Sequence, residues 1–262
     1  MSESRSSSRR FASLARLFGD AGLERLWAAR VIVVGIGGVG SWAAEALARS
    51  GLGQIDLIDM DHIAESNINR QVHALSSSLG AAKVDAMRAR IADISPECVV
   101  RVHDCFAQPD NVADLLDVSA NVIIDATDQV RAKAAMAGLA RDRRQNLIMC
   151  GAAGGRTDPM ALADEDIALV KGDALIASVR AKMRRDYGFP RETAKPFGIR
   201  ALYSRESLGN TAGRGLLARA EDNSSPGAPL ACSGYGSMVT VTAAFGFAAA
   251  SLAMNTILGK RR

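Results

Sequence analysis

A glycine-rich turn constrains the fold of this chain more than any other part of its sequence. The run "RVIVVGIGGVGSWAAEALARSG", residues 30–51, joins an apolar, β-branched segment to a helical one. A continuous apolar run of this kind predicts a strand buried on both faces. Missing side chains let backbone N–H groups approach phosphate oxygens, and the following helix directs its positive end at them. The sequence therefore predicts a phosphate-binding turn built on Gly35, Gly37, Gly38 and Gly40, which we favour over a tight turn without a ligand.

Strand-like and helix-like segments alternate from Arg30 to Ala152. Alternation of this kind requires parallel strands joined by crossover helices. The expected fold class is therefore α/β, with a doubly wound, mostly parallel, Rossmann-like sheet. Strands are predicted at 30–36, 54–61, 98–106, 121–127 and 146–152, and helices at 38–52, 80–94, 112–118 and 129–144.

The remaining segments divide the chain around this core. We expect a disordered tail at 1–9, followed by a single adenylation-type domain at 10–262. Within that domain, short N-terminal helices precede a nucleotide-binding core at 30–152. From 153 to 262 the alternation dissolves, which predicts a long C-terminal excursion over the sheet as a substrate and crossover region. Its last part has no charged residue from Asn223 to Gly259, and its many small residues favour a buried strand–helix element over a membrane segment.

Cysteine usage and the N-terminus indicate a cytoplasmic protein. The four cysteines are scattered and form no C-x-x-C pair, which argues against a disulfide framework and a two-knuckle zinc site. The first ten residues are polar and basic, with no apolar run behind them, so they do not read as a secretory signal.

The second predicted strand ends at an acid suited to a ribose. Asp59 lies 19 residues after Gly40, where a carboxylate can accept hydrogen bonds from both ribose hydroxyls. NAD and ATP are served equally well by this arrangement. The choice between them depends on the side chains nearer the phosphates.

Charged and amide side chains after the predicted strands at 54–61 and 121–127, and in the predicted helix at 80–94, favour ATP. The run "SNINRQ" supplies Asn67, Arg70 and Gln71, and Lys83 begins the next helix. The two cations, Arg70 and Lys83, suit a longer and more anionic group than the pyrophosphate of NAD. The ordinary alternative is that both are exposed charges on helices. Asp128, just beyond the fourth strand, is placed to hold Mg²⁺ against such a group, or merely to cap a helix. Together these residues predict adenylation, in which charge develops on the leaving pyrophosphate.

The motifs "GIGGVGS", "DMD", "SNINRQ" and "DATD" resemble those of the ATP-dependent activating enzymes that adenylate a carboxylate. This is the ubiquitin-activating superfamily, with its bacterial ThiF and MoeB branches. The chain is most similar to the branch of tRNA threonylcarbamoyladenosine dehydratases, from about Arg10 to the C-terminus. The resemblance implies that Asp59 binds ribose, that phosphates are bound by Asn67, Arg70 and Lys83, and that Asp128 binds magnesium.

Further expectations come from the resemblance alone. It implies a homodimer in which Arg16, or less favourably Arg10, reaches the ATP of the partner subunit; a surface helix charge is the alternative for Arg16. It implies that Cys232 is a nucleophile or sulfur acceptor, although a packed cysteine is the favoured alternative. It also allows a monovalent cation and a cysteine desulfurase as partner. The two C-x-x-C pairs of the ThiF and MoeB branches are missing, which favours the tRNA-modifying branch.

A basic window supports a nucleic-acid partner. Residues 180–205 contain eight Lys and Arg against two acids. Such clusters, with aromatic residues between them, suit a phosphate backbone and unstacked bases, although a solvated charged helix is the alternative. The expected tRNA-binding residues are Arg180, Lys182, Arg184, Arg185, Arg191 and Lys195, with Tyr187, Phe189, Phe197 and Tyr203 as the aromatics.

The leading hypothesis is an ATP-dependent ligase that adenylates the carboxylate of threonylcarbamoyladenosine in tRNA and cyclises it with loss of water. The first alternative is activation of a sulfur-carrier protein with a Gly-Gly tail. An NAD-dependent dehydrogenase and a non-catalytic RNA-binding module are the others. The three histidines lie at no metal-ligand spacing, and none is expected to be catalytic, although His73 is close enough in sequence to "NRQ" to touch phosphate.

Overall fold

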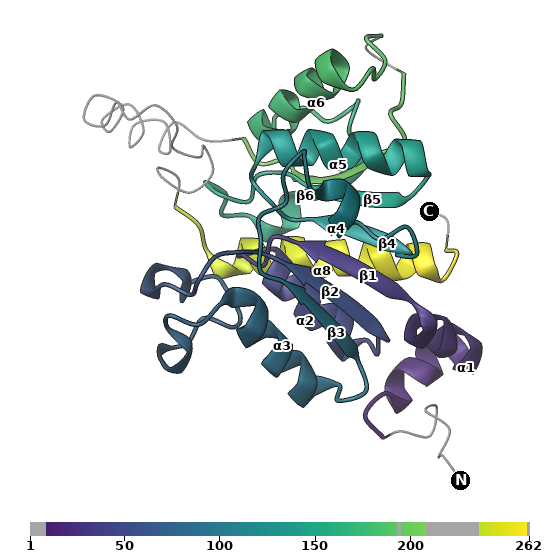
Figure 1. The fold of residues 1–262 in the computed structure, drawn as a ribbon, viewed down its shortest axis with the longest axis vertical. Coiled ribbons are helices and arrows are strands. Elements are labelled where there is room, and N and C mark those ends of the chain that lie inside the picture. Colours follow the sequence, from purple (N-terminus) through teal and green to yellow (C-terminus); the bar gives the residue numbers. More distant parts are fainter. Residues whose placement is uncertain (1–8, 193–194, 208–235, 261–262) are drawn as a thin grey trace.

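The protein is built on one seven-stranded sheet with helices on both faces (Figure 1). The computed structural model describes residues 9–192, 195–207 and 236–260. The strand order is β3-β2-β1-β4-β5-β7-β6, and every pair is parallel except β7 with β6. The strands are β1 (Arg30–Val34), β2 (Gln54–Ile58), β3 (Val99–His103), β4 (Val122–Asp125), β5 (Asn146–Cys150), β6 (Leu162–Asp166) and β7 (Arg200–Ser204).

The helices fall where the sequence predicts them in the first half of the chain. They are α1 (Ala12–Ala28), α2 (Gly40–Arg49), α3 (Lys83–Ile94), α4 (Val112–Leu115), α5 (Val130–Arg143), α6 (Ala174–Asp186) and α8 (Val239–Ile257). The doubly wound α/β class is confirmed. Helix α1 is interrupted at Gly19, whose φ of 71° breaks the helical path, so the segment is divided into short helices as expected.

The sheet extends further than the sequence suggests. Beyond residue 153, where the alternation was expected to dissolve, β7 continues the parallel sheet and β6 closes its edge in the antiparallel direction. The acidic sequence of β6, "LADED", hides this strand because it lacks an apolar run. Its charges are used locally: Asp164 pairs with Arg200 of β7, and Asp166 accepts backbone N–H groups of Phe197 and Gly198.

Two apolar layers hold the helices to the sheet. One layer joins the sheet to α4, α5 and α6, and the other joins it to α2, α3 and α8. Helix α8 is the one described helix that is long and apolar enough to cross a membrane by length and composition. In this fold it packs against α2 and against β4, β5 and β7, so a C-terminal helix lies over the sheet as expected.

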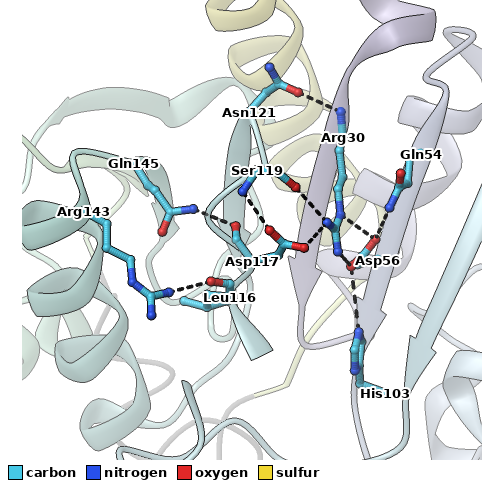
Figure 2. Close-up of polar contacts among 10 residues, drawn as sticks. All are labelled: Arg30, Gln54, Asp56, His103, Leu116, Asp117, Ser119, Asn121, Arg143 and Gln145. Atoms are coloured by element: carbon cyan, nitrogen blue, oxygen red, sulfur yellow. Dashed lines mark hydrogen bonds and ion pairs between the residues drawn. The ribbon is translucent and has the colours of Figure 1, made fainter. Parts of the chain in front are cut away.

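A polar cluster connects β1, β2 and β3 with the segment that precedes β4 (Figure 2). The Arg30 guanidinium bridges the fully buried carboxylate of Asp56 and the carboxylate of Asp117. Figure 2 shows His103 approaching Asp56 from β3, with 3.8 Å between the imidazole and the carboxylate. Because Arg30 begins β1, this cluster fixes the strands without direct contact with the glycine turn at the other end of β1.

A second buried ion pair ties the carboxyl ends of β4 and β5. Lys133 of α5 and Asp125 of β4 are both fully buried, with 3.1 Å between their charged groups. The Lys133 ammonium also donates to the backbone carbonyl of Cys150 at 2.7 Å. Because Cys150 ends β5, this one side chain connects two strands and a helix immediately beneath the loop that carries Asp128.

We predict that Lys133→Met destabilises the protein by about 3–5 kcal/mol, because it leaves the Asp125 carboxylate buried without its partner. Urea denaturation followed by circular dichroism measures the change. The matched control is Arg88→Met on α3, which breaks an exposed pair with Asp85 and should change stability by about 1 kcal/mol or less. Equal effects of the two substitutions would contradict the structural role of Lys133.

Candidate nucleotide site

The glycine turn brings α2 directly onto the end of β1. A Cβ atom added to Gly40 would lie 1.8 Å from the carbonyl oxygen of Gly35, so no side chain fits there. Gly35 has a φ of +86°, and a Cβ on it would lie 3.0 Å from the backbone carbonyl of Ala126. The first N–H groups of α2 therefore stand beside a turn whose four glycines carry no side chains of their own, and such turns accept phosphate.

Asp59 is joined to this turn by hydrogen bonds. Its Oδ2 accepts the backbone N–H of Ile36 at 2.6 Å, and its Oδ1 accepts the N–H of Asp61 at 2.8 Å. Burial raises the pKa of this carboxyl, and the nearby Lys83 charge opposes that rise. A carboxylate has about four acceptor positions, so both oxygens keep capacity for ribose hydroxyls.

The segment that carries "SNINRQ" is folded against α2 and α8. Asn67 is buried and its side-chain oxygen accepts the N–H of Ala64 at 3.0 Å, which shapes the turn. Asn69 donates to the carbonyl of Ser237 just before α8, and Trp42 of α2 donates to the carbonyl of Arg70 at 2.9 Å. These bonds hold the segment over the glycine turn.

The structure places Arg70 and Gln71 at the glycines. A Cβ on Gly38 would lie 3.4 Å from Cγ and Cδ of Arg70, so the arginine stem lies against the turn. The guanidinium donates to the carbonyl of Ser66 at 2.6 Å and to Asn69 at 3.0 Å. Gln71 is buried beside Gly37, and its side-chain oxygen has no hydrogen-bond partner among the described residues.

Lys83 and Asp128 approach the turn from two other strand ends. Lys83 begins α3, is buried, and donates to Asp61 at 2.6 Å. Asp128 is partly buried, accepts a bond from Gln129 at 3.1 Å, and lies two residues after Ala126, which packs on Gly35.

The donor set fits a nucleotide with several phosphates. The glycine turn, a ribose-type acid and two cations lie at the carboxyl ends of the parallel strands. Within the described part of the chain no group of three or more His, Cys, Asp or Glu could hold a metal alone. One carboxylate such as Asp128, completed by phosphate oxygens and water, is nevertheless the set with which proteins hold Mg²⁺ on a nucleotide.

Two predicted residues are not part of this arrangement. Arg16 is exposed on α1, which precedes β1 and so lies at the opposite end of the strands from the turn (Figure 1). It cannot serve the turn of its own chain. Cys232 lies outside the described residues. The three described cysteines are half-buried or buried, and burial raises the pKa of Cys98 to about 11 and that of Cys150 to about 12.

Several cations of the basic window at 180–205 form hydrogen bonds or ion pairs within the chain, which the sequence alone does not suggest. Arg180 donates to the carbonyls of Ile167 and Val170, and Arg184 donates to the carbonyl of Pro190. Both Lys182 and Arg185 pair with Asp186, whereas Arg191 and Lys195 are exposed. The expectation that the aromatics meet unstacked bases is wrong for Phe189, Phe197 and Tyr203, which are buried in the core because they cover the helix-bearing face of β7.

Sequence reasoning missed the role of Asp61 and the burial of His73. Asp61, the second acid of "DMD", pairs with Lys83, and its place after a strand end was a usable signal. His73 is buried, with neither ring nitrogen hydrogen-bonded among the described residues. Burial, with the charges of Lys83 and Arg90, lowers the pKa of His73 to about 4, so the imidazole is neutral near pH 7.

The fold and this edge of the sheet define a doubly wound nucleotide-binding protein. The chain belongs to the ThiF family, whose model matches residues 9–262.

Its relatives give a finer comparison. The tRNA threonylcarbamoyladenosine dehydratase of Escherichia coli (strain K12) is 41% identical over 252 residues, covering 96% of this chain and 94% of the relative. The crystal structure of that E. coli enzyme, TcdA, in complex with ATP superposes with a TM-score of 0.86 at 40% identity, covering 98% of this chain and 97% of the other. The adenylyltransferase and sulfurtransferase MOCS3 of Drosophila willistoni is 34% identical over 113 residues, only 43% of this chain and 24% of its own length.

We predict that His73 makes the protein less stable in mild acid. Its folded pKa of about 4 lies below the ordinary 6.5, so the unfolded chain takes up a proton first as pH falls. The neutral imidazole causes no loss of stability well above pH 6.5. As the pH falls from 6.5 towards 4 the folded state loses stability relative to the unfolded chain, and the loss at pH 5 is about 2 kcal/mol.

Urea denaturation at pH 7 and pH 5 measures this effect. His73→Leu should reduce the loss of stability between the two values by about 2 kcal/mol. The control His62→Leu changes an exposed histidine and should leave the difference as in the unaltered protein. If the two variants behave alike, the buried imidazole is not the cause.

Proposed function

We propose that this protein is an ATP-dependent enzyme that acts on tRNA, adenylating the carboxylate of threonylcarbamoyladenosine and closing it to a cyclic product. One observation carries the proposal: the cations Arg70 and Lys83 and the 126–128 loop meet at a glycine turn that already has a ribose-type acid. The likeness to the E. coli dehydratase over 96% of the chain supports the choice of substrate.

The reaction divides into two steps. In the first, a carboxylate oxygen of the substrate attacks the α-phosphorus of ATP, and pyrophosphate leaves with the charge that Arg70 and Lys83 neutralise. In the second, the carbamoyl group of the same substituent attacks the activated carbonyl carbon, a proton is lost and AMP leaves. The second step is intramolecular, so it gains from holding both groups in one geometry.

Each side chain has a distinct part in this scheme. Asp59 binds the ribose, Asn67 and Gln71 shape the phosphate-binding turn, and Asp128 would hold Mg²⁺ with the phosphate oxygens. Lys83 is paired with Asp61, and an ammonium has three donors, so Lys83 would bind a phosphate oxygen while it keeps this partner.

The partners follow from the same scheme. The tRNA would meet the exposed cations Arg185, Arg191 and Lys195, while Lys182 keeps its bond to Asp186; Arg180 and Arg184 support this surface from beneath by binding carbonyls. A homodimer would bring Arg16 of one subunit to the ATP of the other. Activity on tRNA supports a cytoplasmic location. Cys232 as a sulfur acceptor or nucleophile, a desulfurase partner and a monovalent cation rest on the family resemblance.

Activation of a Gly-Gly-tailed carrier protein is the second candidate. Its support is the likeness to MOCS3, which is confined to 43% of this chain. The sequence also lacks the paired C-x-x-C cysteines of the carrier-activating branches.

The substrate test compares two tRNA preparations that differ in one modification. ATP conversion to AMP and pyrophosphate should be at least tenfold faster with tRNA carrying threonylcarbamoyladenosine than with the same tRNA lacking it. Product tRNA digested to nucleosides should contain a species lighter by one water in mass spectrometry. Equal turnover with both tRNAs would contradict the proposed substrate. Stimulation of ATP conversion by a Gly-Gly-tailed carrier protein would favour the second candidate.

We predict that Arg70→Ala and Lys83→Ala each weaken ATP binding by about 10- to 100-fold, the worth of a charge-assisted hydrogen bond. AMP binding should change by less than about threefold, because both cations address the outer phosphates. Isothermal titration calorimetry with the two nucleotides measures this, and Arg88→Ala, an exposed residue of the same helix as Lys83, is the control. Equal losses for AMP and ATP would mean that the cations act elsewhere.

A further inference from the structure

A third cation at this edge of the sheet is buried, and most of its donors have no partner within the described part of the chain. Arg156 follows β5 by six residues and is 2% exposed. One guanidinium nitrogen donates to the carbonyl of Gly172 at 3.2 Å. Among the described residues, its Nε and the other terminal nitrogen have no hydrogen-bond partner, and no carboxylate forms an ion pair with it.

A charge in this state is costly in the free protein. Taking a cation out of water costs several kcal/mol unless an anion and hydrogen bonds compensate it. Glu206 is an acid on which Arg156 has an electrostatic effect: Arg156 helps to lower the pKa of Glu206, though less than its other partners do. Both oxygens of Glu206 are already bonded to Thr157 and Asp158, so Glu206 is satisfied without the guanidinium.

The order of the strands gives Arg156 its place in the site. Asp59 follows β2, the glycine turn follows β1, Asp128 follows β4, and Arg156 follows β5. Parallel strands lie about 4.8 Å apart, so the order along this edge is ribose, phosphates, Asp128 and then Arg156. Arg156 therefore lies on the side of Asp128 that is away from the ribose-type acid Asp59.

The backbone around Arg156 is held tightly. Ala152 donates to Asp173, the residue that caps the start of α6, and a Cβ on Gly151 would lie 2.3 Å from the same carboxylate. Gly155 donates to the carbonyl of Gly236 at 2.8 Å. The guanidinium is thus presented by a fixed frame, which is what a binding residue requires.

We propose that Arg156 binds an oxyanion of the acceptor substrate, beside the nucleotide. This inference rests on the proposed function. Two of the three guanidinium nitrogens, Nε and one terminal nitrogen, are free to donate to oxygens of a carboxylate or a phosphate. Two groups of the substrate have this chemistry: the carboxylate that is to be adenylated and a backbone phosphate of the tRNA.

Stability and substrate affinity together test the proposal. Arg156→Met removes the charge at similar length. In the absence of substrate the Tm of Arg156→Met should equal or exceed that of the unaltered protein, because an unpaired buried cation has been removed. Its Kd for ATP should change by less than about twofold, whereas the KM for the modified tRNA should rise about 10- to 100-fold. Arg156→Lys should recover only part of the affinity, since an ammonium lacks the paired donors.

A lowered Tm with an unchanged KM would show that Arg156 is structural and would overturn the proposal. If the unaltered protein does not discriminate modified from unmodified tRNA, the proposed function fails instead, whatever the variants do.

A second arm distinguishes the two oxyanions. The free nucleoside threonylcarbamoyladenosine has the carboxylate and no phosphate, and its binding to the ATP-analogue complex can be measured by calorimetry. Weaker binding of both nucleoside and tRNA to Arg156→Met identifies the carboxylate as the ligand. Weaker binding of tRNA alone identifies a phosphate. Unchanged binding of both overturns the proposal.

Discussion

The contact between Gly40 and the carbonyl oxygen of Gly35 is the constraint on which the rest of the site depends. No Cβ fits between them, so the first turn of α2 sits directly on the end of β1. This position exposes the helix N-terminus and brings the 126–128 loop against Gly35. Trp42 of the same helix then binds the carbonyl of Arg70 and so sets the height of that segment above the turn. A shift of α2 would move the phosphate cradle and one of its cations together.

Each loop of the site is held by a buried polar contact at its base. Asp59 joins the second strand to the turn, Asn67 shapes the arginine-bearing segment, and Lys133 joins β4 to β5 beneath Asp128. The Lys83 ammonium is held in place by its ion pair with Asp61. The proposed binding residues are therefore positioned by ion pairs and hydrogen bonds at the base of each loop, and such fixed positions suit the stabilisation of a charged transition state.

Local patterns predicted most of this edge of the sheet. The strands from β1 to β5, the crossover helices, the glycine turn and the residues Asp59, Arg70, Lys83 and Asp128 all follow from periodicity and from the rule that carboxyl ends of parallel strands converge. Properties that depend on residues distant in the sequence could not be predicted from local patterns. The acidic strand β6 has no apolar period, and the burial of Phe189 and Phe197 depends on packing against α5 and α6. For Arg156 and His73, nothing in the local sequence distinguishes a buried charged or polar side chain from an exposed one.

The charges of β6 have a consequence for the behaviour of the protein at high concentration. An open sheet ends in strands whose free N–H and C=O groups can pair with another molecule, and acidic side chains on such a strand repel a second copy of itself. Asp164, Glu165 and Asp166 lie in sequence on that outermost strand, where Asp164 is paired with Arg200 and Asp166 accepts backbone N–H groups. At the opposite margin, β3 carries Arg101 and His103. Charged side chains on both outer strands thus oppose growth of the seven-stranded sheet by edge-to-edge aggregation.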